Sequence, residues 1–219
     1  MSIITYELDI SIDGNAVSSI VQAGQAITIV KAVTCFVMTA DGSEIKTTQN
    51  YLPTAWLQFQ PFENNTVTWT ETYQLYASNT QLNAGIRIHQ LSHTQVQLGW
   101  MYTFAGNIFN GSQSCAQLTT YNLKNEQGTT FNFGLSQQAI INDGQSAFAP
   151  LNAIPVLNNQ QATLSPTETV YIFLSTYCGD GVLINCVPGQ ALAVTLTPQT
   201  PVAKNIGFND TTNTFYLQT

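Results

Sequence analysis

Turn-forming dipeptides recur along this chain about every 8–12 residues and separate short segments that have the composition of β-strands. Asp13-Gly14 and Asn142-Asp143-Gly144 are examples, and such sequences form the tight turns that connect strands. Helical periodicity is absent except in Leu135–Ile141, where we expect one short turn at most. The chain shows no internal repeat, so we expect an all-β fold over residues 1–219. We predict a single antiparallel β-sandwich with little or no helix, and a jelly roll or an Ig-like sandwich as alternatives.

The first segment with strand character covers residues 3–12, where every second side chain is apolar. These apolar residues, which we expect on one buried face, are Ile4, Tyr6, Leu8, Ile10 and Ile12. Two further strands are expected over Ala16–Gln22 and Gln25–Lys31, separated by Ala23-Gly24. In the second of them Ile27, Ile29 and Lys31 share one face.

The stretch from Pro53 to Thr80 contains two of the three tryptophans and is the centre of the predicted domain. Two extended runs, residues 55–59 and 66–70, flank the polar break Pro61-Phe62-Glu63-Asn64-Asn65. This pattern predicts a strand, a loop and a strand. We expect Trp69 to pack between Val67 and Tyr73.

Two hairpins are predicted in the second half of the chain. Residues 118–123 and 129–135 flank Asn125-Glu126-Gln127-Gly128, and residues 170–177 and 182–187 flank Gly179-Asp180-Gly181. In every short-loop register of the second hairpin, Cys178 and Cys186 point to opposite faces or lie about 13 Å apart. A disulfide needs Cα atoms within roughly 7 Å, so we expect these two thiols to stay unbonded to each other. The other cysteines are Cys35 and Cys115, no C-x-x-C pair occurs, and we expect four free thiols.

Charged residues make up only 8% of the chain, against roughly 25% in a typical domain. The net charge is −7, and the five basic residues are scattered. Binding to phosphate backbones depends on clustered Lys and Arg, so we expect no nucleic-acid partner. A surface rich in Thr, Ser, Asn and Gln instead suits neutral polar ligands or further copies of the same chain.

The first 17 residues carry no basic segment followed by an apolar one, and no stretch reaches the ~18 apolar residues of a membrane helix. From this we expect a protein that is cytoplasmic or exported without a leader, with no signal peptide or transmembrane segment.

Catalytic and metal-binding motifs are absent from the sequence. It contains no G-x-S-x-G, no P-loop and no G-x-G-x-x-G. His89 and His93 would share a face of a strand but lie about 13 Å apart, which is too far to bind one ion. We therefore expect a non-catalytic protein without a metal or cofactor.

Aromatic and amide side chains are concentrated in the central stretch. A sugar presents an apolar C–H face, which an aromatic ring can bind, and a ring of hydroxyls, which amides can bind. The alternative role of these aromatic residues is to fill the core. The residues that we predict to contact a ligand are Trp56, Asn64, Asn65, Trp69, Tyr73, Tyr76 and Asn79. The leading hypothesis is lectin-like recognition of a neutral glycan or another hydroxyl-rich ligand by a homo-oligomer.

The alternative hypothesis is a self-assembling or membrane-oligomerising β protein of the pore-forming or inclusion type. Low charge and many strand edges favour self-association, and a Thr- and Ser-rich hairpin can line a pore. Membrane contact is expected only under this alternative.

Overall fold

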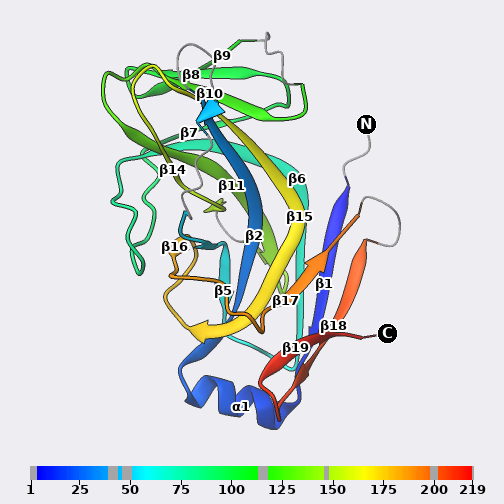
Figure 1. Cartoon of the computed structure of the whole chain (residues 1–219). Helices are drawn as coiled ribbons and strands as arrows, with labels where there is room; N and C mark the ends of the chain where they lie inside the picture. The colour runs from blue at the N-terminus through cyan, green and yellow to red at the C-terminus, as the bar shows by residue number, and fades with distance from the viewer. Residues whose placement is uncertain are drawn as a thin grey trace.

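The computed structural model describes residues 4–38, 44–45, 51–112, 118–145, 148–197 and 202–218. It is nearly all β: two large curled sheets pack face to face, and one helix lies at one end of them (Figure 1). This confirms the predicted all-β sandwich. Pairing is mainly antiparallel, and the β1–β18 and β8–β10 pairs are parallel.

The first sheet has nine strands, of which six form the path β12-β11-β6-β1-β18-β19. They are β12 (Gly144–Gln145), β11 (Phe131–Ile141), β6 (Asn64–Ser78), β1 (Thr5–Ser11), β18 (Ala203–Asn209) and β19 (Thr214–Leu217). The strands β13 (Ala149–Pro150) and β14 (Ile154–Val156) also pair with β11, and β7 (Ser92–Gln95) pairs with β6.

The second sheet has eight strands and follows the path β3-β2-β15-β10-β8-β9. They are β3 (Glu44–Ile45), β2 (Gln25–Met38), β15 (Gln161–Thr176), β10 (Tyr121–Asn125), β8 (Met101–Ala105) and β9 (Ile108–Ser112). The strands β17 (Leu192–Thr195) and β5 (Leu57–Phe59) pair with β15 and β2, and β4 (Thr54–Ala55) pairs with β16 (Val182–Leu183) as a separate ribbon.

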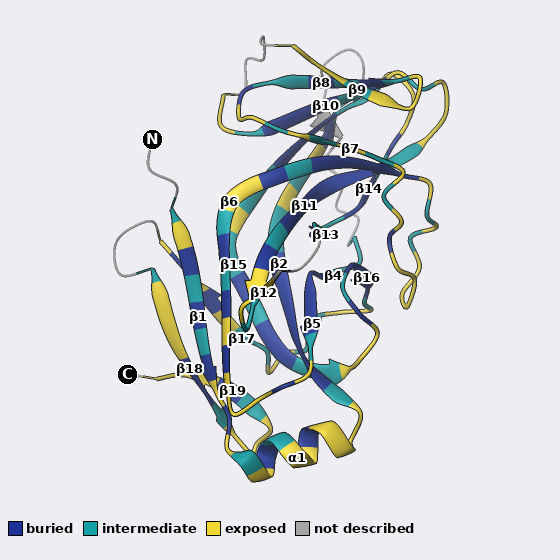
Figure 2. Ribbon diagram, turned by 180° about the vertical axis from the view of Figure 1, so that it is seen from behind, coloured by how far each residue is buried: buried dark blue, intermediate teal, exposed yellow. Residues whose placement is uncertain are grey.

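The core lies between the sheets and draws on residues from β1 to β19. Strand β1 shows the predicted alternation, because Tyr6, Leu8 and Ile10 are buried while their neighbours are partly or fully exposed (Figure 2). Trp69 is buried on β6 on the same side as Val67 and Tyr73, as predicted.

The prediction of a strand over Ala16–Gln22 is wrong, because this segment belongs to helix α1 (Gly14–Gln22). The Asp13 side chain accepts a hydrogen bond from the Asn15 amide at 2.9 Å and so caps the helix. Ala16 and Ile20, one helical turn apart, are the buried residues of α1. The segment is therefore an amphipathic helix, and its apolar residues follow the period of a helix instead of that of a strand.

No helix among the described residues is long and apolar enough to cross a membrane.

Residues Leu135–Ile141 form the second half of strand β11, so the short helical turn considered there is wrong. The segment pairs with β6 on one side and with β12 and β13 on the other. Residues 133–137 are all buried, so both faces of the strand are covered there, and the loss of alternation obscured the strand in the sequence. The predicted turn at Asn142-Asp143-Gly144 is confirmed, and both Asn142 and Asp143 have positive φ.

Both predicted hairpins are wrong. Residues 121–125 and 131–141 belong to different sheets, so the chain at Asn125–Gly128 crosses the sandwich. After β15 the chain is held against β5 instead of turning back: the Gln58 Oε1 atom accepts hydrogen bonds from the amides of Cys178 and Gly179, both at 2.7 Å. The hairpin geometry that led us to expect unbonded Cys178 and Cys186 is therefore absent. Both are free and exposed, Cys35 is free, and Cys115 lies outside the described residues.

Candidate functional site

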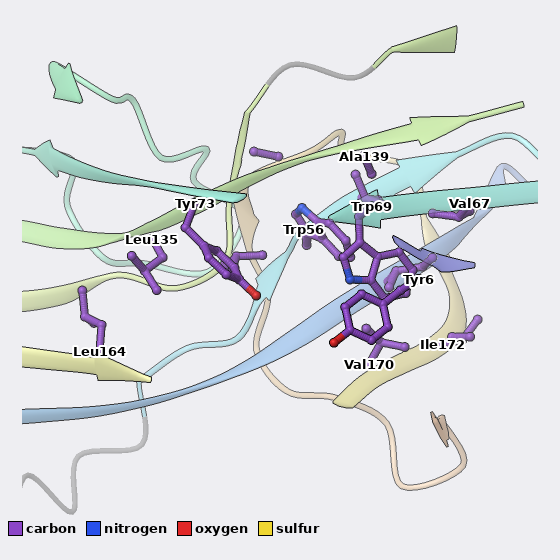
Figure 3. Packing of buried hydrophobic residues seen from close by; sticks show 14 of the residues in the cluster. Tyr6, Trp56, Val67, Trp69, Tyr73, Leu135, Ala139, Leu164, Val170 and Ile172 are labelled. Carbon is purple, nitrogen blue, oxygen red and sulfur yellow. The ribbon is translucent and has the colours of Figure 1, made fainter. Parts of the chain in front are cut away.

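The four predicted aromatic ligand contacts lie in the interior. Trp56, Trp69, Tyr73 and Tyr76 are all buried. Trp56 and Trp69 meet edge to face with ring centroids 5.4 Å apart, and Trp69 stacks on Tyr6 from β1 at 5.8 Å (Figure 3). These rings therefore fill the space between the sheets, which is the alternative role that their chemistry allows.

A buried ion pair lies beside these rings. Lys31 Nζ on β2 lies 2.7 Å from Glu168 Oε2 and 2.9 Å from Oε1 on the neighbouring strand β15. The Lys31 side chain is 0% exposed, and the Glu168 side chain is 12% exposed. Removing two charges from water is costly, so such a pair persists only where further hydrogen bonds and close partners compensate.

The remaining polar atoms around the ion pair supply this compensation. Tyr73 OH donates to Glu168 Oε1 at 2.8 Å, and Trp69 Nε1 donates to Oε2 at 2.9 Å. Lys31 Nζ also donates to Gln137 Oε1 at 2.9 Å. The ammonium group lies 5.2–5.7 Å from the centroids of three aromatic rings, within the range of cation–π attraction. Three of the four predicted aromatic residues, Trp56, Trp69 and Tyr73, thus surround an internal cation.

Irregular strand pairing brings these groups together. The register between β2 and β15 shifts between Pro166 and Val170, and Glu168 lies within that shift. The register between β6 and β11 shifts between Gln137 and Ala139. A bulge redirects side chains locally, so the two shifts place Glu168 and Gln137 against Lys31.

Burial changes the protonation equilibria of this cluster. Desolvation lowers the pKa of Lys31 to about 8, although the Glu168 charge opposes the shift. Desolvation also raises the pKa values of the Tyr6, Tyr73 and Tyr121 phenols, and nearby carboxylates add to the shift. The three phenols therefore stay protonated at neutral pH.

The sequence placed Lys31 on the apolar face of its strand but did not identify the cluster. A lysine on an apolar face was the signal that could have indicated it.

The predicted asparagines do not join the aromatic residues in one cleft. Asn65 is buried and holds the loop before β6, since its Nδ2 donates to Phe62 O at 2.7 Å and its Oδ1 accepts from the Phe62 amide at 2.9 Å. Asn64 and Asn79 are exposed. Asn64 is the first residue of β6, and Asn79 follows its last residue.

His89 and His93 are both exposed, and no group of three or more potential metal ligands occurs among the described residues.

Asn64 lines an open groove of about 460 Å³ between the start of α1 and the edge of the first sheet. Asp13, Glu63 and Gln218 also line this groove, together with Tyr216 of β19. The Tyr216 ring lies over Gly207, its direct partner on β18. A Cβ atom added at residue 207 would be closer to the ring than van der Waals contact allows. Sequence reasoning missed Tyr216 because the pairing of β18 with β19 creates this arrangement.

No protein-family model, no curated protein and no solved structure matches this chain.

Proposed function

We propose that the protein is a non-catalytic binding protein that recognises a neutral glycan or another hydroxyl-rich ligand in the groove beside Asn64. The observation that carries this proposal is the position of Tyr216, which is 46% exposed and lies over Gly207 inside the groove. A tyrosine ring held against the sheet offers an apolar face to the C–H face of a sugar.

The polar residues of the groove suit the hydroxyls of such a ligand. Asn64 and Gln218 carry amides that donate and accept hydrogen bonds, and the carboxylate of Glu63 accepts them. The two carboxylates of Asp13 and Glu63, in a chain of net charge −7, disfavour anionic ligands. The proposal therefore keeps Asn64 from the predicted set and adds Tyr216.

Glycan-array screening followed by calorimetry tests the proposal. We expect Tyr216→Ala to lower the affinity at least about tenfold, because the substitution removes an aromatic contact and the area that it buries. Tyr216→Phe should retain binding because the ring remains. Tyr177→Ala is the matched control, since Tyr177 is 54% exposed and does not line the groove.

Binding should change little between low and physiological salt, because it depends on neutral hydrogen bonds. Equal affinities of wild type and Tyr216→Ala would contradict the proposed site, and a tenfold loss of affinity with salt would contradict the neutral ligand.

A second candidate function is self-association, and the end of the molecule opposite α1 favours it (Figure 1). Residues 88–123 contain no Asp, Glu, Lys or Arg, and this stretch includes the exposed side chains Leu98, Ile108 and Leu118. Within the described part of the chain, β9 pairs only with β8. An uncharged edge strand lacks the charges that commonly prevent edge-to-edge association.

Sedimentation over a range of protein concentrations tests this second function. We expect the wild type to form oligomers and Ile108→Lys to shift the equilibrium towards the monomer. Val21→Lys on α1 should leave the equilibrium unchanged, because Val21 is an apolar residue at the opposite end that is 48% exposed, against 58% for Ile108. A wild type that stays monomeric at all concentrations would contradict self-association.

A further inference from the structure

A second cavity, independent of the groove, lies where β2, the segment 51–54 and the connection between β13 and β14 meet. It has a volume of about 360 Å³, within the range of about 300–1,000 Å³ that is typical of small-molecule sites. Its walls are mainly apolar and include Val33, Leu52 and Ile154. None of its residues lines the groove beside Asn64.

Two hydroxyl groups of this cavity have no hydrogen-bond partner among the described residues. They belong to Tyr51 and Thr54, and both oxygen atoms are buried. The Thr54 residue as a whole is 0% exposed. Buried polar groups are paired in the great majority of cases, so an unpaired one calls for an explanation, of which a bound molecule is one.

The side-chain amide of Asn152 is a third polar group of the cavity, and its nitrogen has only a weak acceptor. Asn152 Oδ1 accepts a hydrogen bond from the Leu135 amide at 3.0 Å, which fixes the side-chain amide. Its Nδ2 atom donates to Cys35 Sγ at 3.2 Å, and a thiol sulfur is a weak acceptor. Asn152 therefore retains donor capacity at the wall of the cavity.

The charges around the cavity favour an uncharged ligand. Among the described residues that line it, Lys31 is the only Lys, Arg, Asp or Glu, and its ammonium group is already bound to Glu168 in the core. Burial raises the pKa of the Cys35 thiol to about 12, so the thiol is neutral at physiological pH. A charged ligand would lose its hydration without gaining a counter-ion.

We propose that this cavity binds a small, uncharged, mainly apolar molecule that carries one carbonyl or hydroxyl oxygen. The apolar part fills the space along Val33, Leu52 and Ile154, and the oxygen pairs with the hydroxyls of Tyr51 and Thr54. Asn152 offers a further donor. The site is a pocket for a neutral ligand and carries out no covalent step.

Ligand-observed NMR and calorimetry with three probes of similar shape test the proposal. We expect cyclohexanone and cyclohexanol to bind the wild type, and cyclohexylammonium not to bind. Thr54→Val, which preserves the shape of the side chain, should weaken cyclohexanone binding about fivefold to tenfold through loss of one hydrogen bond. Thr68→Val, outside the cavity, is the matched control.

Two further measurements keep the test decisive. Val187→Trp should block the cavity, because Val187 is a partly exposed wall residue, and should abolish binding of both neutral probes. Cyclohexanone should also slow alkylation of Cys35 in a variant in which the other three cysteines are serine. The proposal is overturned if the neutral probes fail to bind at millimolar concentration, or if Thr54→Val and Val187→Trp bind them as well as the wild type does.

Discussion

Lys31 and Glu168 lie on neighbouring strands and form an ion pair at 2.7 Å inside the sandwich, where the Lys31 side chain has no exposed surface. Glu168 reaches Lys31 because the pairing of β2 with β15 is interrupted at its position. The pair joins the two sheets, since Tyr73 and Trp69 of the opposite sheet donate to the same carboxylate. The interior of this protein is thus organised around a charge, and its stability should respond to changes in that charge.

Lys31→Met should lower the free energy of unfolding by about 3–5 kcal/mol, because it leaves the Glu168 carboxylate buried without its cation. The double variant Lys31→Met/Glu168→Gln should recover much of this loss, since no unpaired charge remains. Lys124→Met is the control: Lys124 and Glu126 form a half-exposed pair, and its loss should cost at most about 1 kcal/mol. Urea unfolding measures all three. Equal losses for Lys31→Met and Lys124→Met would refute the buried pair.

The stability difference between wild type and Lys31→Met should increase as the pH rises from about 8 towards 10. Burial lowers the pKa of Lys31 from 10.5 to about 8, so in this range the folded protein binds fewer protons than the unfolded chain. The free energy of unfolding then rises with pH. Because both proteins share every titrating group outside the pair, their difference reports the titration of the Lys31–Glu168 pair. A difference that stays flat or falls over this range would show that Lys31 keeps its proton.

Wild-type stability should fall steeply above about pH 10. Burial raises the pKa values of the Tyr6, Tyr73, Tyr76 and Tyr121 phenols, so the folded protein keeps protons that the unfolded chain loses there. Tyr76→Phe should make this fall less steep. Tyrosinate absorbance, followed together with circular dichroism, provides the measurement. Ionisation of these four phenols without loss of tertiary structure would contradict it.

Trp69→Ala should cost roughly 3–5 kcal/mol of stability, because it opens a cavity between the sheets and removes a donor to Glu168. Trp69→Phe should cost less, since part of the ring volume remains. Phe62→Ala, at an exposed aromatic residue, should change the free energy of unfolding by less than about 0.5 kcal/mol. If Trp69→Ala instead kept wild-type stability and lost ligand binding, Trp69 would belong to a binding site.

Gly134→Ala should destabilise the protein by roughly 1–3 kcal/mol or more. A Cβ atom at Gly134 would overlap the Asn152 carbonyl oxygen and lie 2.6 Å from Tyr76 OH, and the backbone part of this overlap cannot move easily. Gly189→Ala is the control, because no heavy atom lies within 4 Å of the corresponding position. Thermal unfolding of both variants makes the comparison, and similar melting temperatures would argue against the close contact of β11 with residue 152.

Local patterns in the sequence predicted the features that depend on neighbouring residues. The alternation in residues 4–12 identified the buried face of β1, and the turn at Asn142-Asp143 has the positive φ values that such residues tolerate. The helix at Gly14–Gln22 also had local signals, a capping Asp13 and apolar residues four apart, but Asp13-Gly14 was interpreted as a turn between strands.

The sequence by itself determined the fold class, the strand-rich core and the face on which Lys31 lies, because these follow from turn chemistry and from the two-residue period of a strand. Only the tertiary structure decided which strands pair. The predicted hairpins failed because the strands on either side of Asn125–Gly128 enter different sheets and the chain after β15 is held by Gln58. Tertiary structure also brought Glu168 to Lys31 and Tyr216 over Gly207. Such contacts join residues far apart in the chain, and the free energy that selects them comes from burial between whole sheets.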